Sequence, residues 1–412
     1  MADDEPVDEA QGMQDSVGLL LLSRREQGRT LTDPQDLPPL LTLAEVYGVH
    51  RALSATASTL GHHVGWKCGA CAPESQAALG LEHPFRAPLF QGRIFTDDRT
   101  TVDLAKVNLQ MLEAEFAFIM RSDLPPRESG PYTAAEVWDA VALVVPAIEV
   151  CGTRWAGEAL EEATPLHRIA DGGINESCAL GDAVEAAGIR RDLDQVGVRL
   201  LVNGQEASAG SGANVLEHPV NALTWLANEL LEASISTQSS QYGGGALVGL
   251  MQGDLVMSGA ATLVPAGQLK EGDVVTAEFD GMGSVEVAIA DSSGAEAVVA
   301  DGGGAASPAV AMDPAEWRQL CAEAREAGAT VPMIYPWSAV REASVRELLA
   351  EAAADPHTEL RAELDGLKLS ELKKRARGAG VDGDALDEAD DEDDVRAAVV
   401  ALLLAATGAP KL

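Results

Sequence analysis

Three glutamates in two apolar segments are the residues of this sequence best suited to hold a cation. Glu113 and Glu115 are separated by one residue in the run Leu112–Phe116, and Glu149 lies in the apolar run 145–150. Because side chains alternate between the two faces of a β-strand, Glu113 and Glu115 are expected to project from one face. A hard divalent cation such as Mg²⁺ prefers oxygen ligands and retains waters or substrate oxygens, so two or three carboxylates suffice for a site.

The same pattern is also typical of a surface strand that binds nothing. Carboxylates are mostly exposed in folded proteins, and polar residues alternate with apolar ones in any half-exposed strand. On that interpretation Glu113 and Glu115 face water, and Glu149 is an unrelated surface acid. These three residues alone favour the surface interpretation, so the rest of the chain must decide.

The elements expected to position these glutamates are short strands with a few helices. Apolar residues recur at helical spacing in segment 43–53. A second helix is expected over residues 218–231, with Pro219 in its first turn. Elsewhere between residues 61 and 290, β-branched runs alternate with turn signals, and segment 272–288 predicts a hairpin. The pattern indicates a mixed α+β fold that is rich in β-structure.

Composition divides the chain into four segments. Residues 1–14 are acidic and are expected to be disordered, whereas residues 15–290 are expected to form the main domain. Residues 291–309 are rich in Gly, Ala and Ser, which is typical of a flexible linker. Residues 310–412 are rich in Ala, Glu, Leu and Arg and predict a small helical module.

Charge and cysteine content narrow the classes of function. The formal net charge of −36 disfavours nucleic acid and anionic membranes as partners, because both attract positive surfaces. Five irregularly spaced cysteines, an odd number, argue against a disulfide framework and for a reducing compartment. The sequence shows neither an apolar stretch of membrane-spanning length nor a secretory signal, so a cytoplasmic location is expected.

Several short motifs are spread over residues 15–290. Each motif alone is a weak signal of a family, but their order along the chain is a specific one. They are Val64-Gly-Trp-Lys-Cys-Gly69, Glu113-Ala-Glu115, Ala147-Ile-Glu149 with Arg154 five residues on, Ile169-Ala-Asp171, Asn203-Gly-Gln-Glu206, Gly210-Ser-Gly-Ala213, His218-Pro219, Trp225-Leu-Ala-Asn228, Gly253-Asp254, Ser258-Gly259 and Gly281-Met-Gly-Ser-Val285. The ordered set resembles the 2-keto-4-pentenoate hydratase and 4-oxalocrotonate decarboxylase branch of the fumarylacetoacetate hydrolase superfamily.

The resemblance implies a fold, a metal site and a reaction. It implies a β-rich mixed-sheet fold, a homo-oligomer, and Mg²⁺ or Mn²⁺ bound by Glu113, Glu115 and Glu149. The substrate would be a 2-oxo or 2-hydroxy acid that chelates the cation through its carboxylate and 2-oxygen. The first reaction implied is the addition of water to a 2-hydroxy-2,4-dienoate, which gives a 4-hydroxy-2-oxo acid. The second is loss of CO₂, as in a 4-oxalocrotonate decarboxylase.

Further residues in the matched motifs are expected to bind the substrate: Lys67, Arg154, Asp171, Ser258 and Gly259. Lys67 is also the residue expected to move a proton, with a pKa lowered by partial desolvation and a nearby dication. Without the resemblance, Lys67 is better interpreted as a surface lysine beside a turn. Ser258 and Gly259 would then form an ordinary tight turn after a strand.

Some positions depart from the family pattern. Family members often read Asp-x-Pro-Asp-Phe-Gly where this chain has residues 82–87, so that Phe85 replaces an acid and Ala87 a glycine. Gly172 stands where the family has asparagine, although Asn175 lies close in sequence. These changes motivate a third hypothesis, in which the chain is a catalytically weakened scaffold or interaction protein.

Two more motifs carry no catalytic prediction. Cys68 and Cys71 have redox-type spacing, but the sequence offers no second cysteine or histidine pair to complete a ligand set. Segment 367–381 resembles the first helix and turn of SAP-like modules, in which a basic helix can contact nucleic acid. Because residues 382–394 are strongly acidic and would repel phosphates, this module is expected to contact a protein partner or simply to pack, rather than to bind nucleic acid.

Overall fold

The computed structural model divides the chain into two compact units, Met1–Arg318 with Met333–Ala339, and Gln319–Pro332 with Val340–Leu412. The residues whose structure is described are 9–39, 42–55, 60–96, 100–127, 129–189, 192–238, 249–290, 369–379, 381–382, 395 and 399. The predicted linker at 291–309 lies outside the described residues, as does most of segment 310–412. The linker and the SAP-like module therefore stay predictions.

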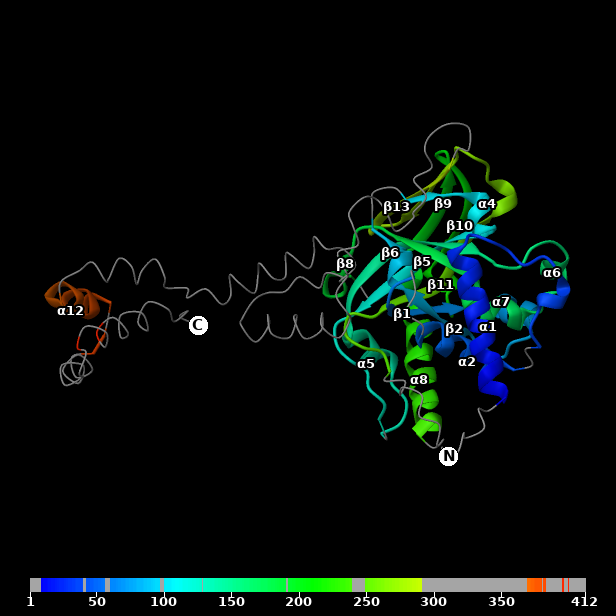
Figure 1. The fold of residues 1–412 in the computed structure, drawn as a ribbon. Helices are drawn as coiled ribbons and strands as arrows, with labels where there is room; N and C mark the ends of the chain where they lie inside the picture. The colour runs from blue at the N-terminus through cyan, green and yellow to red at the C-terminus, as the bar shows by residue number, and fades with distance from the viewer. Residues whose placement is uncertain are drawn as a thin grey trace, which may run out of the picture. The chain divides into compact units, whose positions relative to one another are not determined.

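The described helices include the two that the sequence pattern predicts in the main domain, together with others that it does not (Figure 1). They are α1 (Glu9–Glu26), α2 (Leu43–Ala55), α3 (Pro73–Leu79), α4 (Leu104–Val107), α5 (Ala134–Asp139), α6 (Gly157–Glu162), α7 (Pro165–Ala170), α8 (Pro219–Gln238) and, in the second unit, α12 (Leu369–Gly378). Helices α2 and α8 confirm the two predicted helices, and Pro219 is the first residue of α8. Helix α1 begins at Glu9, so the prediction of disorder through residue 14 is wrong. None of the described helices is long and apolar enough to cross a membrane.

Two sheets form the framework of the first unit. The strands are β1 (His63–Gly69), β2 (Phe85–Phe90), β3 (Ile94–Phe95), β4 (Thr100–Val102), β5 (Leu109–Met120), β6 (Val141–Gly152), β7 (Asn175–Leu180), β8 (Val184–Glu185), β9 (Gly197–Val202), β10 (Gln205–Ser211), β11 (Leu255–Pro265), β12 (Val274–Phe279) and β13 (Gly283–Ile289). Within the described residues, the larger sheet runs β2-β1-β11-β5-β6-β7-β3 with β8 on β6, and the smaller runs β10-β9-β12-β13-β4. Strands β1 and β11 pair in parallel, whereas β5 pairs antiparallel with both β11 and β6. The predicted hairpin is β12–β13.

The main core lies between the two sheets and includes the buried face of α8. Leu112, Ala114 and Phe116 of β5 face this core, where the ring of Phe116 meets that of Phe279 edge-on at 5.2 Å. These are the residues that the alternation of β5 assigns to the face opposite Glu113 and Glu115. Packing of this face therefore turns the two glutamates to the other side of the larger sheet.

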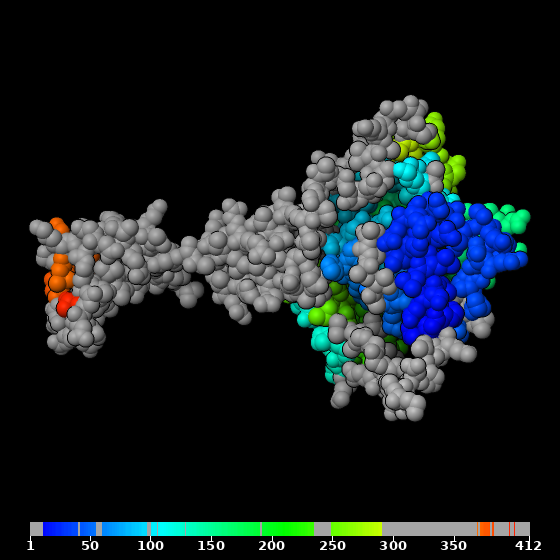
Figure 2. Space-filling view, in the orientation of Figure 1, coloured from blue at the N-terminus to red at the C-terminus, as the bar shows by residue number. Residues whose placement is uncertain are grey.

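The other side of the larger sheet carries an apolar cluster of its own, and the N-terminal helices lie near it. Ala117 of β5, Val145 and Ala147 of β6 and Met257 of β11 belong to this second cluster. Helix α1 packs on α2, and α2 packs on α7 and β2. In the space-filling view the residues coloured blue, which include α1 and α2, cover a broad part of the visible face (Figure 2).

A buried histidine between α2 and α7 makes the stability of this layer dependent on pH. His50 is buried, and its Nε2 lies 2.7 Å from the Ile169 carbonyl oxygen, to which it donates. Burial lowers the pKa of His50 from 6.5 to about 3, although the hydrogen bond to Ile169 acts in the opposite direction. The unfolded chain therefore takes up a proton below pH 6.5 that the folded chain does not.

We expect the free energy of unfolding to fall by about 1.4 kcal/mol for each pH unit between the unfolded and folded pKa values of His50. Urea unfolding of the wild type and of His50→Gln at pH 7 and pH 5 measures this. The wild type should lose about 2 kcal/mol more than the variant over that interval. Equal losses in the two proteins would contradict the assignment to His50.

Candidate metal centre and substrate site

Strands β5 and β6 bring the three glutamates together. Their antiparallel pairing places Glu113 directly opposite Glu149, and Glu115 follows on the same face of β5. Glu115 and Glu149 are fully buried, and Glu113 is partly buried. The surface interpretation of these residues is therefore wrong, and the prediction that Glu113 and Glu115 share a face is confirmed.

Burial and mutual repulsion raise the pKa values of two of these carboxyl groups. The pKa of Glu113 is raised to about 7 by burial and by Glu149, while Lys67 acts in the opposite direction. Burial, followed by Glu149 and Glu113, raises the pKa of Glu115 well above its usual value. Glu115 Oε1 is buried without a hydrogen-bond partner in the described part of the chain. A divalent cation would relieve both the repulsion and the missing contact, so these side chains fit a metal ion.

Lys67, in the middle of β1, pairs with the third glutamate. Its Nζ donates to both carboxylate oxygens of Glu149, at 2.6 and 2.8 Å, and to the Gly173 carbonyl at 3.2 Å. The residue is only 3% exposed, so its interpretation as a surface lysine is wrong. Burial disfavours the charged ammonium, but Glu149 outweighs burial and raises the pKa of Lys67. The expected lowering of this pKa therefore depends on a bound dication and is not a property of these side chains alone.

The short segment Gly172–Ile174 directs a carbonyl toward Lys67. Its residues have φ values of 66°, 64° and 59°, a left-handed run that is strained at the β-branched Ile174. Immediately after it, Asn175 Nδ2 donates to Glu149 Oε1 at 3.0 Å. Two of the contacts that fix the site thus come from the carbonyl of Gly173, within this strained segment, and from the amide of Asn175, which directly follows it.

Phe85 forms an apolar wall beside Lys67. Lys67 Nζ lies 6.0 Å from the centre of the Phe85 ring. A Cβ atom at Gly69, the register partner of Phe85, would lie 2.1 Å from the ring, and one at Gly173 would lie 2.5 Å from it. Both glycines are therefore needed to admit this ring, which stands where the family pattern has an acid.

Ser258 and Gly259 lie within β11 at an irregularity of its pairing with β5, so their interpretation as a turn after a strand is wrong. Gly259 N–H donates to Glu115 Oε2 at 2.8 Å, and Ser258 Oγ–H donates to the Gly259 carbonyl at 3.4 Å. The amide expected to bind a substrate carboxylate therefore holds a candidate metal ligand instead. A substrate contact by the Ser258 hydroxyl stays a prediction.

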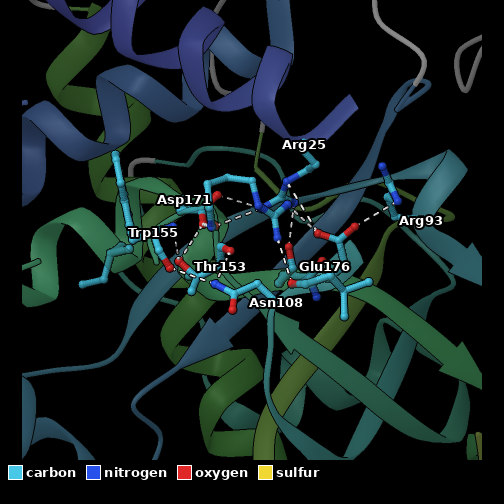
Figure 3. Close-up of polar contacts among 12 residues, drawn as sticks. Arg25, Arg93, Asn108, Thr153, Trp155, Asp171 and Glu176 are labelled. Carbon is cyan, nitrogen blue, oxygen red and sulfur yellow. Dashed lines mark hydrogen bonds and ion pairs between the residues drawn. The ribbon is translucent and has the colours of Figure 1, made fainter. Parts of the chain in front are cut away.

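A second buried polar cluster is centred on Asp171 and Glu176, which flank residues 172–175 in the sequence (Figure 3). Asp171 accepts hydrogen bonds from the Arg154 backbone N–H at 2.6 Å, the Thr153 hydroxyl at 3.0 Å and the Arg25 guanidinium at 3.0 Å. Arg25 also donates to the Asn175 carbonyl at 2.6 Å, which links this cluster to the residue that contacts Glu149.

Glu176 is the acidic residue around which the three arginines of this cluster lie (Figure 3). It accepts hydrogen bonds from Arg154 at 2.6 Å and from Arg93 at 3.0 Å, and Arg25 lies 4.0 Å away. Arg154 and Asp171, which are expected to bind substrate, are 3% and 1% exposed and bind protein groups. Their contacts indicate that they position the adjoining segment, and their contact with a substrate stays a prediction.

The sequence motifs and this geometry agree with comparisons to known proteins. The family model described as fumarylacetoacetate (FAA) hydrolase C-terminal matches residues 72–290, more than half of the chain. The chain belongs to the fumarylacetoacetate hydrolase family.

Relatives within this family support the branch indicated by the motifs. The 2-keto-4-pentenoate hydratase of Paraburkholderia xenovorans is 30% identical over 267 residues, which cover 64% of this chain and 90% of that protein. The 4-oxalocrotonate decarboxylase of Pseudomonas putida is 27% identical over 253 residues, 60% of this chain and 85% of that protein. The solved structure of 4-oxalocrotonate decarboxylase from Pseudomonas putida G7, complexed with magnesium and adipate, has the same fold. Its TM-score is 0.57 at 23% identity, and it covers 69% of this chain and 100% of that chain.

Sequence reasoning missed one member of the site in this fumarylacetoacetate hydrolase family protein. Cys151 follows Glu149 by two residues on β6, so both side chains lie on one face. Donor atoms of Glu113, Glu149 and Cys151 all lie within 4.8 Å of one another. The alternation that groups Glu113 with Glu115 would also have identified Cys151.

Proposed function

We propose that this chain is a metal-dependent lyase that adds water to a 2-hydroxy-2,4-dienoate and releases a 4-hydroxy-2-oxo acid. The proposal is carried by the buried Glu115 and Glu149, which lie with the partly buried Glu113 on one side of the larger sheet, and by the bond of Lys67 to Glu149. Mg²⁺ or Mn²⁺ held by these carboxylates would bind the substrate carboxylate and 2-oxygen and favour negative charge there. Relatives named as hydratases support this reaction.

Lys67 is the residue that would hold or move a proton at the substrate. An ammonium has three N–H donors, and those of Lys67 are directed at Glu149 and the Gly173 carbonyl. Lys67 must therefore release one of these contacts before it can reach a substrate oxygen or carbon. Gly173 provides the weakest of them, because its acceptor is uncharged and lies farthest from Nζ.

Phe85 supports hydration over decarboxylation. The two candidate substrates differ at the end remote from the 2-oxo acid, where 4-oxalocrotonate carries a second carboxylate and the hydratase substrate is apolar. The buried ring of Phe85 beside Lys67 supplies apolar contact and no hydrogen-bond donor. A decarboxylase nevertheless stays the second candidate, because a relative of that name matches most of its own length.

A spectrophotometric assay tests the function. Purified protein is mixed with 2-hydroxypenta-2,4-dienoate or with 4-oxalocrotonate, in Mg²⁺ or in EDTA. Glu115→Ala removes a buried carboxylate, and Glu185→Ala is the matched control because Glu185 is exposed.

Loss of the dienoate chromophore in the wild type and in Glu185→Ala, abolished by EDTA and by Glu115→Ala, is the expected result. Loss of the 4-oxalocrotonate chromophore alone would select the decarboxylase. If neither chromophore is lost although elemental analysis finds bound metal, the hydratase proposal fails and the scaffold hypothesis gains support.

A further inference from the structure

Cys151 places a sulfur atom among the carboxylates of the candidate metal centre. The residue lies on β6 and is fully buried, two residues after Glu149. Two donors that lie about 2.0–2.3 Å from one ion are at most about 4.6 Å apart. The donor atoms of Glu113, Glu149 and Cys151 all lie within 4.8 Å of one another, so small side-chain movements would bring them to one ion.

A second observation points to a cation at the same place. Glu115 projects from the face of β5 that carries Glu113, and its Oε1 is buried without a hydrogen-bond partner among the described residues. Glu113 and Glu149 both act on the Glu115 carboxyl, which therefore lies beside these two glutamates, although it is not among the three donor groups that lie within 4.8 Å of one another. A buried carboxylate oxygen without a donor is costly, and a metal ion removes that cost.

We propose that Cys151 is a ligand of the metal in this site, and that the site binds borderline transition-metal ions such as Zn²⁺ and Co²⁺ more tightly than Mg²⁺. The thiol proton passes to solvent as the sulfur–metal bond forms. Thiolate favours such ions, whereas Mg²⁺ keeps oxygen donors. The inference rests on the metal site of the proposed function and names its class of metal, but it does not depend on the substrate.

Cys178 provides a matched control on the neighbouring strand. It is also fully buried and lies opposite Glu149 in the pairing of β6 with β7. Its Sγ, however, accepts a hydrogen bond from Asn175 Nδ2 at 3.4 Å. Cys178→Ser therefore changes a buried cysteine at the same depth beside the same glutamate without removing the proposed ligand.

Titration of the full-length protein with Co²⁺ and with Mg²⁺ tests the proposal. Co²⁺ should give a near-ultraviolet thiolate-to-cobalt absorption band in the wild type and in Cys178→Ser, but not in Cys151→Ser. Calorimetry should show that Cys151→Ser weakens Co²⁺ binding by at least about 10-fold. Mg²⁺ binding should change less than about twofold, since Mg²⁺ uses oxygen donors. Equal Co²⁺ affinity and equal spectra in the three proteins would overturn the proposal.

X-ray absorption spectroscopy of the Zn²⁺-loaded wild type tests for a sulfur ligand directly. It needs no variant, so it does not depend on a variant that folds. A sulfur neighbour at about 2.3 Å is expected, and a shell of oxygen and nitrogen alone at about 2.0–2.2 Å would refute the role of Cys151. If the metal binds through oxygen alone and the enzyme turns over, only this inference fails. If neither ion binds, the metal site and the proposed function fail together.

Discussion

Replacing Glu149 with glutamine should abolish most metal binding and turnover. Glu149 lies opposite Glu113 in the proposed metal site and is also the ion-pair partner of Lys67. Glu149→Gln therefore removes one negative charge from the metal site and the charged partner of Lys67. Substitution of a residue that only hydrogen-bonds to a metal ligand already lowers metal affinity or activity by about 10- to 100-fold. Loss of a ligand itself should therefore lower them by at least about 100-fold. Calorimetric titration with Mn²⁺ and kcat/KM in the dienoate assay measure the two effects.

The control is Glu185→Gln, because Glu185 is exposed. This substitution should leave the Mn²⁺ affinity and kcat/KM unchanged. Loss of the Lys67 partner also affects folding, because a buried charge without its partner costs about 3–5 kcal/mol. Near-ultraviolet circular dichroism must therefore confirm that Glu149→Gln retains native packing. If a folded Glu149→Gln protein binds Mn²⁺ within about twofold of the wild-type affinity, the site has been assigned to the wrong carboxylates.

Replacing Glu176 with glutamine should cause a large loss of stability, of the same size as that expected for Glu149→Gln. The carboxylate of Glu176 is 4% exposed and neutralises Arg154 and Arg93, with Arg25 nearby. Removing one partner from a buried ion pair costs about 3–5 kcal/mol, because the remaining charge has no compensation. Urea unfolding at neutral pH should show a decrease of that size in the free energy of unfolding.

A surface ion pair provides the comparison for this prediction. Glu278 and Arg199 lie 2.8 Å apart, but their side chains are 39% and 49% exposed. Glu278→Gln should therefore change the free energy of unfolding by no more than about 1 kcal/mol. Similar losses in Glu176→Gln and Glu278→Gln would show that the buried arginine cluster does not stabilise the fold as proposed.

Acid should remove the contribution of Glu176. Burial raises its pKa, but Arg154, Arg25 and Arg93 outweigh burial and lower it below the ordinary 4.5. A carboxyl group with a lowered folded-state pKa stabilises the protein above its unfolded pKa and loses this contribution as pH falls through the folded value. The stability difference between wild type and Glu176→Gln should therefore be complete at pH 6 and shrink as pH decreases below 4.5.

The sequence by itself determined the local features of this protein. Alternation assigned Glu113 and Glu115 to one face of a strand, and Pro219 marked the start of α8. These predictions succeeded because strand alternation and helix initiation depend on residues close in the chain. The motifs identified the family because their residues and their order along the chain can be read without knowledge of the fold.

Only the tertiary structure decided how the site is assembled and how it is charged. The pairing of Lys67 with Glu149 joins residues 82 positions apart, and the bond of Gly259 to Glu115 spans 144 positions. The tertiary structure also placed Cys151 beside Glu113 and Glu149, and it directed Arg154 and Asp171 toward other groups of the same chain. Burial, register between strands and pKa arise from contacts between distant segments. Patterns within one segment therefore favoured a surface interpretation for Lys67 and the glutamates, and the packed sheets and helices reversed it.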